Sequence, residues 1–376
     1  MDFDFSERQG KIRDEVRRLF TPDSRFSLEE LENGNDVLIR SSALHWLKIL
    51  GRAGYLVLGL GDGRNTVELV AAQESLATVS PSLFLSVEVS ARIFGRLVAI
   101  YGTPDQRAQL LPALGEGELI GTVAISEGCM SLENNPLSTT GVSFGQGLML
   151  NGSKSHVVNA AIADWIAVAG KTEENTAFFL INKGTEGLSI GQRLSTLGYN
   201  GTAITTITFE NCPISSKYVI GPFEEGQPLA ALRTWEDQIL TAASLGSMHR
   251  CLDAALVHAK NHKSGGKPII AYQEVGFKLA EMLTLLQTAQ LLAYRAAWMA
   301  ETDDREAPVL AHCAKIFCTE SAEQVASYAL QILGGHGYLR GNPAEEGYRD
   351  AKYLQIAGTS SEISRIKLGD TILEGE

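Results

Sequence analysis

The sequence predicts an α+β multidomain protein in which an all-α domain, a β-barrel domain and a four-helix bundle follow one another. Three observations support this order. Apolar residues first recur every three or four positions, short β-branched and aromatic runs then replace that period, and the helical period finally returns. The expected domains are residues 1–119, 120–226 and 227–376.

The first domain is predicted to be helical. The strings "EVRRLF", "ALHWLKIL" and "VELVAAQESLA" space their apolar residues by three and four. Gly and Pro are confined to junctions such as "GLGDGRN" and "YGTPDQ", where they favour turns between helices.

The middle domain is predicted to be a β barrel or sandwich. The strings "GTVAIS", "DWIAVAG", "AFFLINKG", "AITTITFENC" and "KYVIGPF" are short runs of strand-forming residues. Gly, Asn and Ser separate them, as expected for turns between strands.

The last domain is predicted to be a bundle of long helices joined by short loops. Its third helix should stop at Gly334 and Gly335, because glycine commonly ends helices. The apolar residues that mark these helices are Ile239, Ala243, Leu252 and Leu256, then Val275, Leu279, Met282 and Leu286, then Ala314, Phe317, Cys318, Val325 and Ala329.

Composition argues against several classes of function. The formal net charge of -12 argues against nucleic acid or an anionic membrane surface, since both bind clustered Lys and Arg. The 5 cysteines are scattered without a CxxC pair, so neither a disulfide framework nor a metal site is expected. The N-terminus has no apolar run of signal-peptide length, and no segment reaches about 18 uninterrupted apolar residues. A cytoplasmic location is therefore expected.

The tail "LQILGGHGYLRGNPAEEGYRDAKYLQIAGTSSEISR" carries the most specific pattern in the chain. Together with the order of the three domains, it resembles the acyl-CoA dehydrogenase family over nearly the whole length. The resemblance implies an FAD-dependent enzyme that oxidises an acyl thioester. It also implies that two subunits share each cofactor, so we expect a homodimer or homotetramer.

The resemblance implies a set of FAD contacts in three regions. They are the strand "AISEG" with the loop after it, the strand "NGSKSHVVN", and the helix–helix turn and tail of the last domain. The implied cofactor-binding residues are Ile125, Ser126, Ser131, His156, Val158, His262, Ser264, Ile269, Gln273, Gln331, Gly334, Gly335, Ser360 and Glu362.

Several of these positions depart from the family pattern. His156 stands where Trp is usual, Val158 where Thr is usual, and His262 where Arg usually grips the FAD pyrophosphate. Because Arg binds phosphate bidentately and a neutral imidazole does not, we expect FAD to be bound more loosely than in the family at large. The remaining histidines are interpreted as surface or core residues: His45, His249, His258, His312 and His336.

The tail lacks the usual catalytic carboxylate. Family members commonly place a Glu in the tail string "YEGT", but here Gly358 occupies that position. A minority branch places the base on the first long helix of the bundle, and Glu236 falls on that alternative position. A first-turn acid beside Asp237 is the simpler explanation of Glu236, but the empty tail favours Glu236 as the catalytic base. A carboxylate restored at Gly358 is then expected to recover part of the activity of a Glu236→Gln variant.

The strings "TWED" and "GSKSHVVNAAIADWIAVAG" are similar to the acyl carrier protein branch of the family. That branch acts in polyketide and nonribosomal peptide pathways, and the likeness extends to dehydrogenases of aminomalonyl, colibactin-type pathways. It implies a seryl or other hydroxyacyl group on a carrier protein. The electron acceptor, an electron-transfer flavoprotein or oxygen, is left open.

Four other functions also remain open at this stage. They are an acyl-CoA dehydrogenase of ordinary acyl-CoA metabolism, a flavin monooxygenase on the same fold, a catalytically silent subunit paired with a competent homologue, and a nucleic-acid-binding relative without activity. The last would need a basic face, which the net charge of -12 disfavours.

Overall fold

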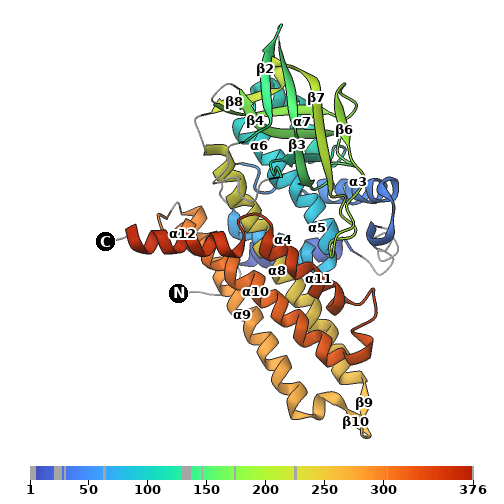
Figure 1. The fold of residues 1–376 in the computed structure, drawn as a ribbon. Coiled ribbons are helices and arrows are strands. Elements are labelled where there is room, and N and C mark those ends of the chain that lie inside the picture. Colours follow the sequence, from blue (N-terminus) through green and yellow to red (C-terminus); the bar gives the residue numbers. More distant parts are fainter. Residues whose placement is uncertain are drawn as a thin grey trace.

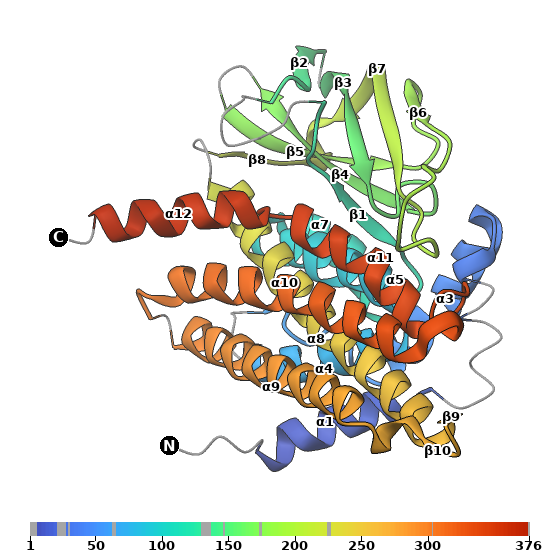
Figure 2. The ribbon, with the colours of Figure 1, turned by 60° about the horizontal axis from the view of Figure 1, so that its bottom comes forward.

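The computed structural model places a β domain at one end of the molecule and a long helical bundle at the other (Figure 1). Helices of the N-terminal domain lie between them and under the sheet (Figure 2). The structure describes residues 6–20, 28, 31–61, 65–128, 137–145, 147–172, 175–223, 227–302 and 304–374.

The N-terminal helices begin where the sequence supplies capping residues. Ser6 and Gln9 form a capping box at the first helix, and Thr103 and Gln106 form another at the last. The elements are α1 (Glu7–Arg18), α3 (Asp36–Arg52), α4 (Thr66–Val79), α5 (Pro81–Glu88), a π-helical segment η1 (Val89–Gly95), α6 (Arg96–Tyr101) and α7 (Pro104–Gly115).

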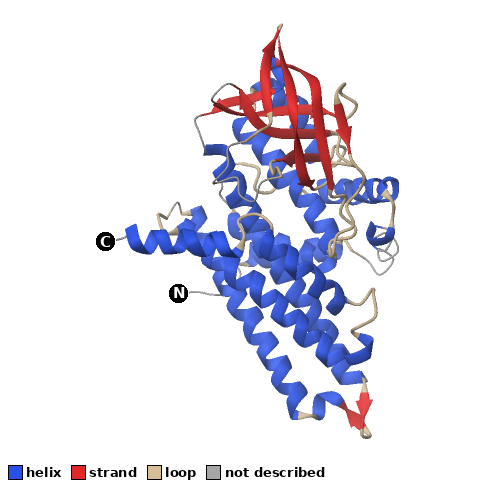
Figure 3. Cartoon of the chain, viewed as in Figure 1, coloured by secondary structure: helices blue, strands red, loops and turns tan. Residues whose placement is uncertain are grey.

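The middle domain is one mixed sheet in the order β6-β7-β3-β2-β4-β5-β8, with β1 pairing in parallel to β4. Figure 3 shows these strands gathered at one end of the molecule. Among the described residues its terminal strands, β6 and β8, do not pair with each other. The strands are β1 (Gly121–Ala124), β2 (Thr140–Phe144), β3 (Gly147–Val157), β4 (Trp165–Thr172), β5 (Asn175–Asn182), β6 (Leu188–Ile190), β7 (Thr205–Ser215) and β8 (Val219–Phe223).

The C-terminal helices form the expected bundle, in which α8, α9, α10 and α11 pack on one another. Helix α10 ends at Leu333, and Gly334 follows with a φ of 56°, which confirms the predicted glycine stop. The elements are α8 (Gln227–Asn261), the hairpin β9 (Lys263–Ser264) and β10 (Lys267–Pro268), α9 (Gln273–Glu301), α10 (Ala307–Leu333), the short turn η4 (Gly334–His336), α11 (Pro343–Ile356) and α12 (Ser361–Glu374).

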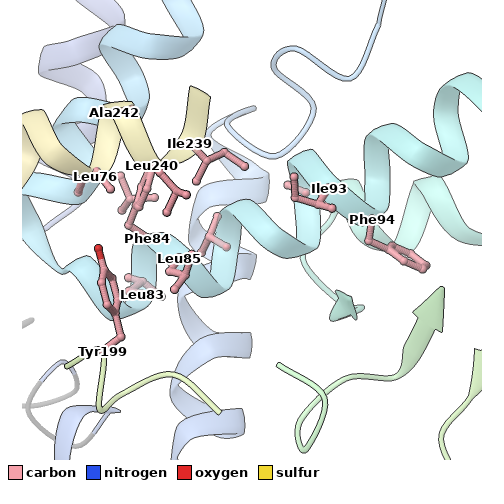
Figure 4. Packing of buried hydrophobic residues seen from close by; sticks show 14 of the residues in the cluster. Leu76, Leu83, Phe84, Leu85, Ile93, Phe94, Tyr199, Ile239, Leu240 and Ala242 are labelled. Carbon is pink, nitrogen blue, oxygen red and sulfur yellow. The ribbon is translucent and has the colours of Figure 1, made fainter. Parts of the chain in front are cut away.

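Buried apolar side chains fix the start of α8 against the N-terminal helices (Figure 4). Ile239 and Leu240 of α8 lie close to Leu76 of α4 and Phe84 of α5, and all four are at most 2% exposed. Burying a side chain of this size contributes about 1.5–3 kcal/mol. The turn of α8 that carries Glu236 is therefore held rigidly. None of the helices in the described ranges is long and apolar enough to cross a membrane.

Candidate active site

The tail turn after α11 packs directly on the start of α8. Gly358 has a φ of +64°, and the amide of Thr359 donates a hydrogen bond of 2.8 Å to Oδ1 of Asp237. A Cβ added at Gly358 would lie 3.4 Å from Cγ of Glu236 and 2.5 Å from Oδ1 of Asp237. The structure thus brings the emptied tail position and Glu236 together, although they are far apart in the sequence.

Glu236 is partly exposed and is paired with an arginine one turn earlier on the same helix. Nη1 of Arg233 donates to Oε2 of Glu236 at 2.8 Å, and the two side chains are 21% and 29% exposed. Burial raises the pKa of the neighbouring Tyr353, and the carboxylate of Glu236 raises it further. Glu236 is therefore accessible from solvent, yet within electrostatic reach of buried groups.

A buried lysine supports this turn from the side of α10. Nζ of Lys315 donates to the carbonyl oxygens of Leu354 and Ala357, and its side chain is fully buried. Burial lowers the pKa of Lys315 to about 8, and the carboxylates of Asp237 and Glu236 oppose that shift. The lysine satisfies carbonyls at the end of α11, which fixes where Gly358 lies.

Asp237 is the acidic counterpart of this lysine. Burial raises the pKa of Asp237 to about 6, against the opposing charge of Lys315 and the hydrogen bond from Thr359. The sequence suggested that Glu236 and Asp237 lie in the first turn of a helix, but α8 begins at Gln227 and has no acid in its first turn. The sequence analysis did not single out Lys315. The sequence did contain a signal for Lys315, which lies inside the apolar string "AHCAKIFC". A lysine in such a string is expected to be buried with its helix face, and a buried lysine almost always has a partner.

The first two residues after β1 are tied to β3. The amide of Ser155 donates to the carbonyl of Ser126 at 2.9 Å, and Nζ of Lys154 donates to the carbonyl of Ile125 at 2.9 Å. The hydroxyl of Thr122 donates to the carbonyl of Val158 at 2.5 Å. Ile125, Ser126 and Val158, all implied flavin contacts, thus lie in one wall.

His156 lies in the same wall, on an irregular part of β3. Its φ is 55°, and the pairing of β3 with β7 shifts register between Lys154 and Val157. A bulge of this kind re-aims the side chain it carries. The imidazole is exposed.

A buried ion pair that sequence reasoning missed anchors this wall. Nζ of Lys154 lies 2.7 Å from Oε1 of Glu127, and their side chains are 0% and 5% exposed. Burial acts to raise the pKa of Glu127, but hydrogen bonds from Lys154, Ser138 and Thr139 lower it to about 2. Glu127 therefore stays ionised and holds the segment that carries Ile125 and Ser126.

The remaining implied cofactor residues lie at the far end of α8. There the β9–β10 hairpin meets the end of α10, and His262 and His336 lie with ring centroids 6.0 Å apart. Gly334 and Gly335 have no atom within 4 Å of an added Cβ, so their backbone is open. Exposed or half-buried side chains of this end are Ser264, Ile269, Gln273 and Gln331.

One chain therefore carries the implied contacts at two separate ends of α8. Glu236 and His258 are 22 residues apart on this helix, which corresponds to about 33 Å at 1.5 Å per residue. Ser360 and Glu362 belong to the Glu236 end, where the hydroxyl of Ser360 accepts from the amide of Ile363 at 3.3 Å. The backbone amide of Glu362 and the Ser360 side chain lower the pKa of Glu362. Ser131 lies outside the described residues.

The residues present fit a flavin cofactor chemically. The buried hydroxyls of Ser361 and Ser364 have no hydrogen-bond partner within the described part of the chain. Open glycine backbone at the other end allows close approach of a diphosphate. By contrast, no group of three or more His, Cys, Asp or Glu in the described ranges could hold a metal ion.

Comparison with known proteins agrees with this geometry. Residues 6–118, 122–212 and 234–373 match the N-terminal, middle and C-terminal domains of acyl-CoA dehydrogenases. A mitochondrial isovaleryl-CoA dehydrogenase of Oryza sativa subsp. japonica is 31% identical over 317 residues, which cover 81% of this chain and 76% of that protein.

Two solved structures illustrate the fold. The prolyl acyl carrier protein oxidase AnaB is 26% identical with a TM-score of 0.85, covering 98% of this chain and 100% of that chain. The FAD complex of PigA is 22% identical with a TM-score of 0.88, and the match covers 100% of both chains. The chain belongs to the acyl-CoA dehydrogenase family, and like the members of that family it is an FAD-dependent oxidoreductase acting on CH–CH bonds.

Proposed function

We propose that the chain dehydrogenates an acyl thioester carried on the phosphopantetheine arm of an acyl carrier protein, with Glu236 as the base. One observation carries this proposal. The stem of Glu236 lies 3.4 Å from the place of a Cβ at Gly358, the tail position that lacks its usual carboxylate. Glu236 can therefore reach the point that a tail Glu would serve.

The reaction needs one carboxylate and one hydride acceptor. Glu236 takes the α-proton of the acyl group, and FAD, when bound, accepts the hydride from the β-carbon. For a 3-hydroxyacyl thioester the product is an enol, the tautomer of the 3-oxo compound. The net reaction is then oxidation of an alcohol, which suits a seryl or related hydroxyacyl group in extender-unit biosynthesis.

Arg233 has a place in this scheme. Its Nη1 donates to Oε2 of Glu236 at 2.8 Å, which orients the carboxylate. The guanidinium also places a positive charge beside the base. Lys315 and Asp237 position the turn and do not need to touch the substrate.

The two-ended distribution of cofactor contacts supports an oligomer. Residues at the Glu236 end and at the His262 end are too widely separated to surround the same part of one FAD within one chain. A neighbouring copy, in a homodimer or homotetramer, would bring its own His262 end to the cofactor held at the Glu236 end.

An acyl-CoA dehydrogenase of ordinary acyl-CoA metabolism is the second candidate. The 31% identity to an isovaleryl-CoA dehydrogenase favours it, whereas the likeness to a prolyl carrier-protein oxidase favours a carrier-bound substrate. The two candidates share the base and differ only in what carries the acyl group.

The test is the rate of anaerobic flavin reduction by matched 3-hydroxyacyl thioesters on carrier protein and on CoA, with products identified by mass spectrometry. We expect faster reduction by the carrier-bound group. Glu236→Gln should lower the rate by about a hundredfold or more, on the order of 3 kcal/mol of barrier, because the base can no longer take a proton.

Glu362→Gln is the matched control, since it changes a carboxylate at the same end of the molecule without touching Gly358. It should alter FAD affinity and leave proton abstraction in the loaded enzyme largely intact. Equal rates on both carriers would establish the second candidate, and wild-type flavin reduction by Glu236→Gln would exclude Glu236 as the base.

A further inference from the structure

Three histidines gather at the end of α8, two of them from that helix end and one from η4. The ring centroids of His258 and His262 are 4.7 Å apart and stacked within 15°, and the ring of His336 lies 5.5 Å from that of His258. They line an open cavity of about 770 Å³ together with Arg250 and Asp253 of the same helix. The sequence did not predict this grouping, because His258 and His336 are 78 residues apart.

The charged groups around this cavity are unevenly distributed. Arg250 is engaged by Glu346 of α11 at 2.9 Å, which leaves Asp253 as the acid lining the cavity. The β9–β10 hairpin carries two further cations, Lys263 and Lys267. The ammonium of Lys267 lies over the ring of Tyr272. The further charged groups next to this end are Lys260 at the end of α8 and the Glu274–Lys278 pair at the start of α9.

Stacked imidazoles resist being charged together. Burial, and then the positive charges of His262 and His336, lower the pKa of His258. An anion placed among the rings removes this repulsion, because it interacts favourably with each imidazolium. Its binding must therefore be linked to proton uptake by the cluster.

We propose that His258, His262 and His336 form a proton-linked clamp for the diphosphate of FAD held by a neighbouring copy of the chain, so that cofactor affinity falls as pH rises. The inference rests on the proposed FAD-dependent function, and it adds the pH dependence of cofactor retention. An arginine in the place of His262 would hold its charge at every physiological pH and would give no such dependence.

The direction follows from linkage. Because FAD binding favours the protonated cluster, the affinity is highest at pH values below the lowered pKa of His258 in the free protein, and it decreases as pH rises above that value until the cluster also loses its proton in the complex. Uptake of about one proton corresponds to an affinity about tenfold weaker for each pH unit within that window.

The experiment uses the apo form of the full chain and follows quenching of FAD fluorescence at pH values from 6 to 8. We expect the Kd for FAD to rise about tenfold or more over this range. Titration calorimetry in buffers of different ionisation enthalpy should show net proton uptake near pH 7. Riboflavin, which lacks the diphosphate, should bind with little dependence on pH, and inorganic diphosphate should compete with FAD more strongly at pH 6.

His258→Gln and His336→Gln should each flatten the pH dependence. The matched control is His45→Gln, because His45 is an exposed histidine on α3 outside the cluster. The inference is overturned if wild-type FAD binding takes up no protons, or if His45→Gln changes the pH dependence as much as the cluster variants do. FAD binding with a flat pH profile would reject the clamp alone, whereas failure of Glu236→Gln to slow flavin reduction would reject the catalytic proposal alone.

Discussion

The turn at Gly358 gives the sharpest test of the site geometry. Gly358→Ala should destabilise the protein, because this residue has a φ of +64° and an added Cβ would lie 2.5 Å from Oδ1 of Asp237 and 3.1 Å from Cδ1 of Leu240. Asp237 is only 4% exposed and accepts the amide of Thr359 at 2.8 Å, so it has little freedom to move.

Two costs add to give the expected magnitude. A left-handed conformation costs a residue other than glycine about 1–2 kcal/mol. Displacing Asp237 breaks a buried hydrogen bond to a charged acceptor, which costs about 1–3 kcal/mol. The free energy of unfolding should therefore fall by about 2–5 kcal/mol, provided that the turn cannot relax.

Gly369→Ala is the matched control for this substitution. Gly369 lies within α12 and has no atom within 4 Å of an added Cβ. Since alanine is favoured over glycine inside helices by up to about 1 kcal/mol, this variant should be neutral or slightly more stable. Urea unfolding of both variants beside the wild type measures the difference. An unchanged midpoint for Gly358→Ala would refute the tight packing of the turn on α8.

The same geometry revises an expectation from the sequence. A glutamate at Gly358 was expected to rescue the Glu236→Gln variant in part, but its Cβ would meet Asp237 before its carboxylate reached the substrate. We now expect the double variant to reduce its flavin no faster than Glu236→Gln alone. Recovery of more than a tenth of the wild-type rate would show that the turn opens to admit the side chain.

Two further predictions concern buried charges. Lys154→Met should lower the free energy of unfolding by about 3–5 kcal/mol because it leaves Glu127 buried without its cation, whereas Lys183→Met, at an exposed lysine, should have little effect in the same urea unfolding assay. Burial raises the pKa of Asp350 to about 7, so the folded state holds more protons than the unfolded state between about pH 4 and 7, and stability falls as pH rises through that window. Asp350→Asn keeps an acceptor for the amide of Tyr199, at 2.7 Å, and should raise the melting temperature at pH 8 but not at pH 4; an equal effect at both would contradict it.

The fold was largely predictable because its signals are local and repeated. Apolar periodicity identified the helices and strands, and the glycine stop after α10 lies where it was expected. The pairing order of the sheet was not predictable, since strands such as β1 and β4 pair across 44 residues and nothing in either strand specifies the partner. The division at residues 119 and 226 remains a prediction.

The site was predictable only where a resemblance supplied positions. Glu236 and Gly358 were identified as alternatives from the family resemblance, but the sequence could not show that they meet in space. Lys315 and the Glu127–Lys154 pair escaped notice because lysine and glutamate are ordinarily exposed, and only burial in the folded chain gives them a structural role. The grouping of His258 and His336 was not predictable either, because the two residues come together only when the ends of α8 and α10 meet in the folded chain.

Packing around Gly358 ties the tail turn to the helix that carries the proposed base. The tail turn lies so close to α8 that a Cβ at position 358 would lie 2.5 Å from Oδ1 of Asp237, whereas its distance of 3.4 Å from Cγ of Glu236 is an ordinary contact. A side chain in the turn would therefore displace Asp237, which accepts the amide of Thr359 at 2.8 Å. Lys315 keeps the turn in this position, because its hydrogen bonds to the carbonyls of Leu354 and Ala357 hold the turn against α8. Glycine in the turn is therefore compatible both with Asp237 and with the proposed base Glu236, and it leaves the packing of the turn on α8 undisturbed.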